Sequence, residues 1–305
     1  MRKVLLATTA LVALGGVSAA SADVTMSGSG SFNYVVGDGT GFVTDSRTTS
    51  TNSDANITLT NAMDNGMTAT TLVSLDEGGV DDAGLKLTGD FGTLAFGGVA
   101  NDTHGAMAAD VTADEGNGMT ATTFGAVMPA DEKIAASTIS LALPAVSGVS
   151  ITLGIGDGAT DTTDSTQAGI SYAMDAGAMG ITVSYASSSD GTAGGANDAT
   201  HTSAKVTAGA ATVTMISGTY GDYENTAIGA TYKVSDALTV QAYTGSTELD
   251  TNANYEVNDT GIGLTYTITT GMSLSVTHND YDGKNGTAAD AESGSRTAIA
   301  LDITY

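Results

Sequence analysis

Apolar side chains fall on every second position along much of this chain. The last ten residues, RTAIALDITY, show the pattern most clearly. Their large apolar side chains occupy alternate positions, at Ile299, Leu301, Ile303 and Tyr305. Successive side chains of a β-strand point to opposite faces, so such a segment has one apolar face and one face of small or polar residues. The segment therefore predicts a strand that separates two different environments.

Similar alternating segments recur from residue 23 to the end of the chain. Sixteen of them are expected, at about 24–34, 56–60, 69–75, 85–87, 94–96, 139–143, 149–155, 168–172, 181–185, 204–206, 213–215, 228–234, 238–242, 262–268, 272–276 and 297–305. Seven short turns are expected to alternate strictly with long connections along the chain. The long connections lie at about 37–54, 76–82, 100–135, 156–166, 187–200, 218–224, 245–258 and 279–295. Strands in hydrocarbon must close on themselves to leave no unpaired edge. The pattern predicts an all-β fold, a 16-stranded antiparallel transmembrane β-barrel with short periplasmic turns and long extracellular loops.

The first 22 residues have a different character. Arg2 and Lys3 precede an apolar stretch at 4–17, and the segment ends on Ala20-Ser21-Ala22. A membrane anchor would need about 20 apolar residues, and this stretch is shorter. We therefore expect a cleaved signal peptide at 1–22 and one barrel domain at 23–305.

The charge balance changes the picture further. The chain has 34 acidic and 9 basic residues, no cysteine, and a mean hydropathy of +0.07. A net charge of −25 argues against nucleic-acid partners and favours cations. Only six acids fall in the short-turn half, at Asp23, Asp64, Asp90, Asp175, Asp236 and Asp302. A soluble, secreted structural or adhesive β-protein that binds calcium is the alternative, but a sandwich gives no reason for this sorting.

Candidate chemistry is sparse. The three histidines lie in separate segments, and no nucleophile or phosphate-loop motif is present, so we expect no enzyme. No cofactor is expected beyond a calcium ion at acidic loops. The segment NDYDGKNGTAAD could supply oxygen ligands for it from Asp280, Asp282, Asn285 and Asp290. Its spacing departs from an EF-hand, and a solvated acidic loop is the competing interpretation.

The few basic residues are informative because of their parity. Each of four basic side chains is expected on the inward face of its strand, namely Lys86, Lys205, Lys233 and Arg296. A Lys or Arg facing the bilayer midplane of a barrel costs about 2–4 kcal/mol, whereas one facing water costs little. Their parity is a second indication that the interior is wet.

The longest connection, at 100–135, is long enough to be functional. If it folds into the lumen, its carboxylates face basic side chains on the wall and set pore size and charge preference. Its acids expected at the constriction are Asp110, Asp114 and Glu115, opposed by Lys86 and Arg296. An outward flap is the other possibility.

Three stretches carry a resemblance to a known family: DVTMSGSGSFNY at 23–34, LKLTGDFGTLAFGG at 85–98 and the terminal RTAIALDITY. The chain resembles the general diffusion porins of gram-negative outer membranes, in particular the small trimeric porins of alphaproteobacteria. The resemblance implies a homotrimer, an inward-folded third loop, and recognition of the last strand by the outer-membrane assembly machinery. Tyr305 stands where the family usually has phenylalanine, arginines are few, and with no tryptophan the interfacial girdles must use tyrosines.

We therefore expect a passive, water-filled channel for small hydrophilic solutes and ions, set in outer-membrane lipid. An acidic rim should make it prefer cations.

Overall fold

A computed structural model describes residues 23–39, 46–76, 79–97, 138–156, 165–189, 198–249, 255–285 and 291–305. The strands are β1 (Asp23–Gly39), β2 (Ser46–Ala62), β3 (Thr68–Asp76), β4 (Gly79–Gly89), β5 (Gly92–Gly97), β6 (Ile139–Ala142), β7 (Val149–Gly156), β8 (Ser165–Ala176), β9 (Met179–Ser189), β10 (Ala199–Ala208), β11 (Ala211–Tyr220), β12 (Tyr223–Lys233), β13 (Leu238–Leu249), β14 (Tyr255–Thr269), β15 (Met272–Asn285) and β16 (Ala291–Thr304).

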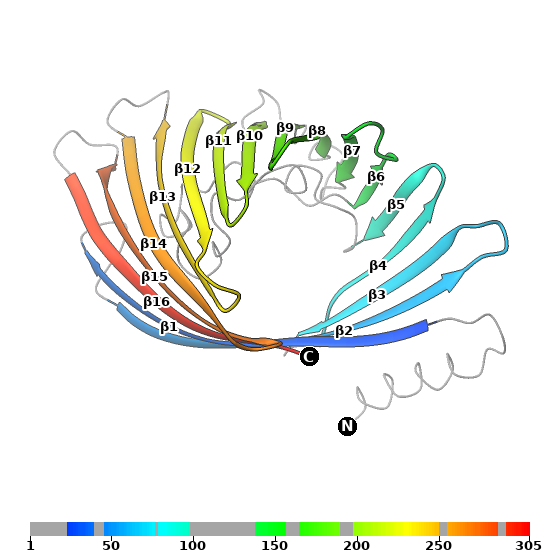
Figure 1. Ribbon diagram of the computed structural model, residues 1–305, viewed down its shortest axis with the longest axis horizontal. Helices are drawn as coiled ribbons and strands as arrows, with labels where there is room; N and C mark the ends of the chain where they lie inside the picture. The colour runs from blue at the N-terminus through cyan, green and yellow to red at the C-terminus, as the bar shows by residue number, and fades with distance from the viewer. Residues whose placement is uncertain are drawn as a thin grey trace.

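The sixteen strands form one closed antiparallel barrel. They follow one another around the ring in chain order, and β16 lies beside β1 (Figure 1). The predicted fold class is confirmed. Within the described segments, no helix is long and apolar enough to cross a membrane. The predicted signal peptide at 1–22 lies outside the described residues.

The seam between β1 and β16 closes the barrel with its last residue. Tyr305 and Gly28 exchange two backbone hydrogen bonds, with N–O distances of 2.8 and 2.9 Å. The Tyr305 ring lies over Gly28, because a Cβ added there would sit 2.4 Å from the ring carbon Cε2. The terminal aromatic thus covers a glycine on the outer surface and extends the ladder by one more pair.

The two faces of the wall differ as the alternation predicts. Large apolar side chains cover the outer face, and register aligns them across strands, as in the row Tyr266, Leu274, Leu301 and Phe32. Tyrosines supply part of the interfacial girdle near the short-turn ends of their strands, at Tyr172, Tyr232, Tyr266 and Tyr305. Tyr185 also faces outward but lies farther from the turn, opposite Ile170. A few apolar side chains, such as Leu72 and Ile216, take inward positions.

The predicted strict alternation of short and long connections is wrong, because two connections predicted to be long are short. β11 and β12 are joined by two residues, Gly221 and Asp222, and β3 and β4 by residues 77–78. Gly221 has φ 55°, which suits a tight turn. Strand pairing also continues into the expected loops at 37–54 and 279–295. The paired residues of these segments are mostly polar on both faces, so hydrophobic alternation does not reveal them, although Thr and Ser suit a paired strand.

The seam gives a direct test of fold stability. Gly28→Ala forces the new methyl group into the Tyr305 ring and close to the backbone oxygen of Asp54, which lies 3.0 Å from the added Cβ. We expect the free energy of unfolding to fall by about 1–3 kcal/mol. The measurement is the temperature at which the folded band on a semi-native gel converts to the unfolded mobility.

Gly30→Ala is the matched control, because its Cβ meets only the Asn52 oxygen, at 3.7 Å. Tyr305→Ala should reduce the cost of Gly28→Ala if the ring causes it. Equal transition temperatures for the two alanine variants would show that the ring does not hold the seam.

Candidate functional site

The inner wall of the barrel is polar. Its buried side chains are mainly hydroxyl and amide groups, among them Ser140, Thr152, Gln167, Ser184, Ser203, Thr214, Asn225, Gln241, Thr277 and Asn279. Some bond across strands, as Ser184 and Ser203 do with their hydroxyl oxygens 2.8 Å apart. Uncharged polar groups thus fill most inward positions, and few fixed charges lie among them.

The four basic side chains all take inward register positions, as the alternation predicts. Lys86 is paired with Thr70 and Ala95, Lys205 with Thr182 and Thr214, and Arg296 with Gly37 and Asn279. Lys233 lies at the short-turn end of β12, where its ammonium contacts the Asp236 carboxylate at 2.9 Å. That contact lowers the pKa of the exposed Asp236, through its hydrogen bond first and its charge second.

The barrel does not gather these basic groups at one place. Lys86 lies three residues from the short-turn end of β4, whereas Arg296 lies eight residues from the end of β16. Three strands, β1 to β3, stand between them. The opposing acids expected at the constriction, Asp110, Asp114 and Glu115, lie outside the described residues. Lys86 and Arg296 therefore remain predicted constriction residues.

A hydrogen-bonded group on β13 to β15 is the most organised feature of the inner wall. The Tyr243 hydroxyl donates a short hydrogen bond to Oδ2 of Asp259, and Nδ2 of Asn279 donates to the Tyr243 oxygen at 2.8 Å. The ring lies flat on Gly261, where an added Cβ would be 2.2 Å from ring carbon Cε1. Glycine at 261 thus allows the hydroxyl to reach across to β15.

Tyr281 lies on the same wall in a similar way. Its hydroxyl would be 1.9 Å from a Cβ at Gly294 and 2.3 Å from one at Gly39. Only 3% of its surface is exposed. Two tyrosines therefore lie against glycines on the next strands, and the lumen keeps the width that their rings would otherwise occupy.

The geometry is that of a channel wall, and the comparisons with known proteins identify which kind. A family model described as Gram-negative porin matches residues 7–293. This chain belongs to the Gram-negative porin family.

Solved structures of porins and of another outer-membrane protein share the fold of this porin at low sequence identity. The anion-selective porin from Comamonas acidovorans is 13% identical with a TM-score of 0.69, over 93% of this chain and 100% of that chain. OmpT of Vibrio cholerae, in its trimer form, is 15% identical with a TM-score of 0.66, over 93% and 99%. A mutant of the Rh. blastica porin is 18% identical with a TM-score of 0.64, over 93% and 100%. No curated protein sequence matches the chain.

The porin is thus an outer-membrane channel protein, and its family and fold are those of channels rather than enzymes. The alternative of a soluble, calcium-binding β-protein is not favoured, because the closed barrel carries its apolar side chains outside. General diffusion requires no catalytic group.

The residues predicted to bind calcium are spread along one strand of the porin. Asp280 and Asp282 lie on the outer face of β15, Asn285 ends that strand, and Asp290 lies outside the described residues. Asp280 instead contacts Nε2 of His278 at 3.4 Å. Among the described residues, no three His, Cys, Asp or Glu side chains come together as a metal site would require.

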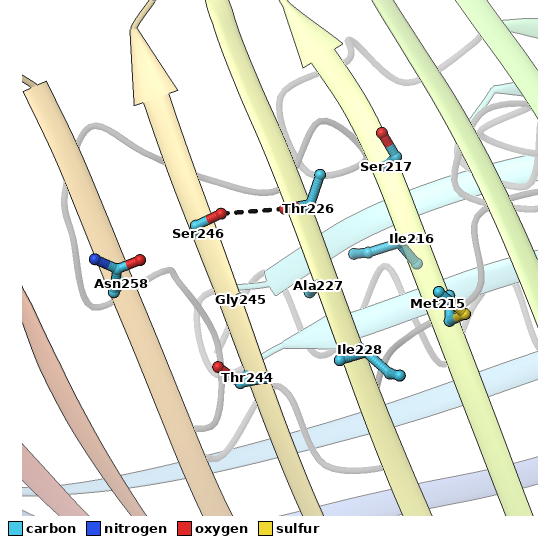
Figure 2. A pocket seen from close by; sticks show the side chains of 10 residues that line it. All are labelled: Met215, Ile216, Ser217, Thr226, Ala227, Ile228, Thr244, Gly245, Ser246 and Asn258. Carbon is cyan, nitrogen blue, oxygen red and sulfur yellow. Dashed lines mark hydrogen bonds between the residues drawn. The ribbon is translucent and has the colours of Figure 1, made fainter. Parts of the chain in front are cut away.

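A hollow of about 460 Å³ lies on β11 to β14, and it is not part of the lumen. Figure 2 shows its lining, in which the Thr226 and Ser246 hydroxyls are joined by a hydrogen bond of 3.1 Å. Most of its lining side chains have outward register positions, including Met215, Ile228 and Asn258. It therefore opens toward the surroundings of the barrel.

Reasoning from sequence missed the Tyr243, Asp259 and Asn279 group. Each residue is polar at an inward position, which alternation shows. That the three meet depends on pairing between β13, β14 and β15, which alternation does not specify.

The opposite environments of the two faces can be checked by cysteine labelling, because the porin has no native cysteine. Lys205→Cys places a thiol on the inner wall, and Val206→Cys places one on the outer face of the same strand. A charged, membrane-impermeant thiol reagent should modify the first about tenfold faster or more, since thiolates form in water and not in hydrocarbon. Equal rates in lipid vesicles would contradict this assignment of faces.

Proposed function

We propose that this porin conducts small hydrophilic solutes passively and prefers cations. The observation that carries the preference is the excess of 34 acidic over 9 basic residues on a chain whose inner wall is mostly uncharged. Acids at a channel mouth raise the local cation concentration within a Debye length, about 30 Å at 0.01 M salt and 3 Å at 1 M. The preference should therefore be strongest in dilute salt.

We further propose that the segment at 98–137 enters the lumen and narrows it. The two residues that flank this segment are hydrogen-bonded to each other. The Gly97 N–H donates to the Thr138 carbonyl, with an N–O distance of 2.8 Å. The hydrogen bond keeps both ends of the segment at the same point on the barrel wall, from which it can reach the lumen. In this proposal Asp110, Asp114 and Glu115 face the lumen.

Reversal potentials in a planar bilayer test the charge assignment. Under a salt gradient, the wild-type porin should give a cation-selective potential that shrinks as salt rises. Replacement of Asp110 and Asp114 by Asn, and of Glu115 by Gln, should move the potential toward zero because the constriction loses its negative charge.

A triple variant at the short-turn end, Asp64→Asn, Asp90→Asn and Asp175→Asn, removes the same net charge elsewhere and should change the potential less. Anion selectivity of the wild type would refute the proposed preference. Equal shifts in the two triple variants would refute the constriction.

We propose that the porin is a homotrimer joined through β1 and β2. The apolar covering of the outer face is interrupted there by small and polar residues in adjoining register, namely Gly28, Gly30, Thr49, Thr51 and Ser53. A lipid-facing surface favours large apolar side chains, whereas a contact between protein copies tolerates small and hydroxyl residues. The trimer form recorded for the Vibrio cholerae protein supports this reading by analogy of fold.

Cross-linking tests the interface. Thr51→Cys should be joined to a neighbouring copy by a short bis-maleimide, and give a dimer band on a denaturing gel. Thr202→Cys, on the outer face of β10 directly opposite in the ring, should stay monomeric. A cross-link at 202 but not at 51 would place the interface elsewhere.

The remaining partners follow from the same surface. We propose that outer-membrane lipid covers the rest of the apolar face, including the hollow on β11 to β14, and that the assembly machinery recognises the last strand with Tyr305 exposed at its end. Divalent cations such as calcium are proposed to associate with the acidic rim.

A further inference from the structure

The group formed by Tyr243, Asp259 and Asn279 has an orientation fixed by its hydrogen bonds. A tyrosine hydroxyl has one proton, and here it is donated to Asp259 Oδ2. The oxygen must therefore accept from Asn279, and the amide places Nδ2 toward it at 2.8 Å. The carbonyl oxygen of Asn279 consequently points away from the hydroxyl.

Two acceptor oxygens remain in this group. Asp259 is 6% exposed and Asn279 is 2% exposed. Oδ1 of each is shielded from solvent and has no well-aligned hydrogen-bond partner in the described structure, although the Thr260 N–H lies near the Asp259 carboxylate. A buried polar atom left without a partner costs about 1–3 kcal/mol, and more when it carries charge. Such a pair of acceptors on a channel wall indicates room for a further donor or cation beside the fixed charge of Arg296.

The ligand chemistry of the group is that of a hard cation. It offers a carboxylate oxygen and an amide carbonyl oxygen, which are the kinds of oxygen that bind hard cations such as calcium in proteins. We propose that Tyr243, Asp259 and Asn279 form a binding station for a sodium- or calcium-type cation on the inner wall. The station rests on the proposed cation-preferring channel and names the residues that the ion meets.

The surroundings suit weak rather than tight binding. Arg296 is the register partner of Asn279, so a fixed positive charge stands in the same inward row. Asp280 lies on the outer face of the neighbouring strand, and its negative charge acts on Asp259 only weakly through the wall. A conducting site must bind an ion well enough to receive it and loosely enough to release it.

The position of the Tyr243 ring determines where the oxygens of Asp259 and Asn279 lie on the wall. Gly261 lets the Tyr243 ring lie flat and hold both neighbours in place. Asp54 offers a contrast on the inner face of β2, because its Oδ2 accepts hydrogen bonds from Asn52 at 3.0 Å and Ser29 at 3.4 Å. Neither of its carboxylate oxygens is buried without a partner, as Oδ1 of Asp259 is.

The first test measures thermal stability, which does not depend on conduction. The purified porin is heated in sodium chloride, calcium chloride or choline chloride at equal ionic strength, since choline is too large for coordination by these oxygens. The wild type should unfold at a higher temperature in sodium or calcium than in choline. Asp259→Asn should lose that difference, and Asp54→Asn should keep it.

Tyr243→Phe is a second variant in case Asp259→Asn misfolds, because it keeps the Asp259 carboxylate and removes the hydroxyl that orients Asp259 and Asn279. It should retain only part of the cation-dependent difference. Identical responses of wild type and Asp259→Asn would overturn the station. So would an equal loss in Asp54→Asn, or the same stabilisation by glycerol in choline chloride, which would assign the acceptors to hydroxyl solutes.

The second test is conductance in a planar bilayer. Wild-type conductance should level off as sodium rises, whereas Asp259→Asn should follow bulk conductivity more closely, because a binding site saturates and open water does not. If the wild type conducts but selects anions, the proposed preference fails while the thermal test still decides the station. If the channel selects cations, but Asp259→Asn and Tyr243→Phe match the wild type in both thermal stability and conductance, the station is refuted and the proposed cation preference stands.

Discussion

Backbone hydrogen bonding in the absence of water is the constraint on which this structure depends. In hydrocarbon, each unpaired N–H or C=O costs several kcal/mol, so strands can cross only as a closed sheet. The exchange of hydrogen bonds between Tyr305 and Gly28 extends closure to the last residue of the chain. With no cysteine to form disulfides, the fold is held by this continuous ladder and by packing on its two faces.

Closure with alternating side chains then gives the porin two surfaces with separate roles. One row across β14, β15, β16 and β1 presents Tyr266, Leu274, Leu301 and Phe32 on the outer face. The adjoining inward positions present hydroxyl, amide and charged groups to the lumen. Because the period is two, a slip of one residue would exchange the surfaces, so the same pairing that stabilises the barrel also determines what the lumen contains.

Much of this could be predicted from the sequence, and the limits have physical causes. Alternation in RTAIALDITY shows a strand and its parity, and the inward positions of Lys86, Lys205, Lys233 and Arg296 follow from it. The part of β2 at residues 46–54 could not be predicted, because these residues are polar and show no alternation of apolar and polar side chains. Tyr243 contacts Asp259 and Asn279, which lie 16 and 36 positions away in the sequence. These contacts depend on the register between strands, which the local sequence pattern does not encode. The constriction acids lie outside the described residues and remain predictions.

The central claim is that one sheet closes around water with lipid outside, and single-channel recording tests it most directly. Purified protein added to a planar lipid bilayer should produce discrete, ohmic steps of conductance that persist at low voltage. Protein that stays dispersed in buffer without detergent, and leaves the bilayer silent at any concentration, would contradict the account.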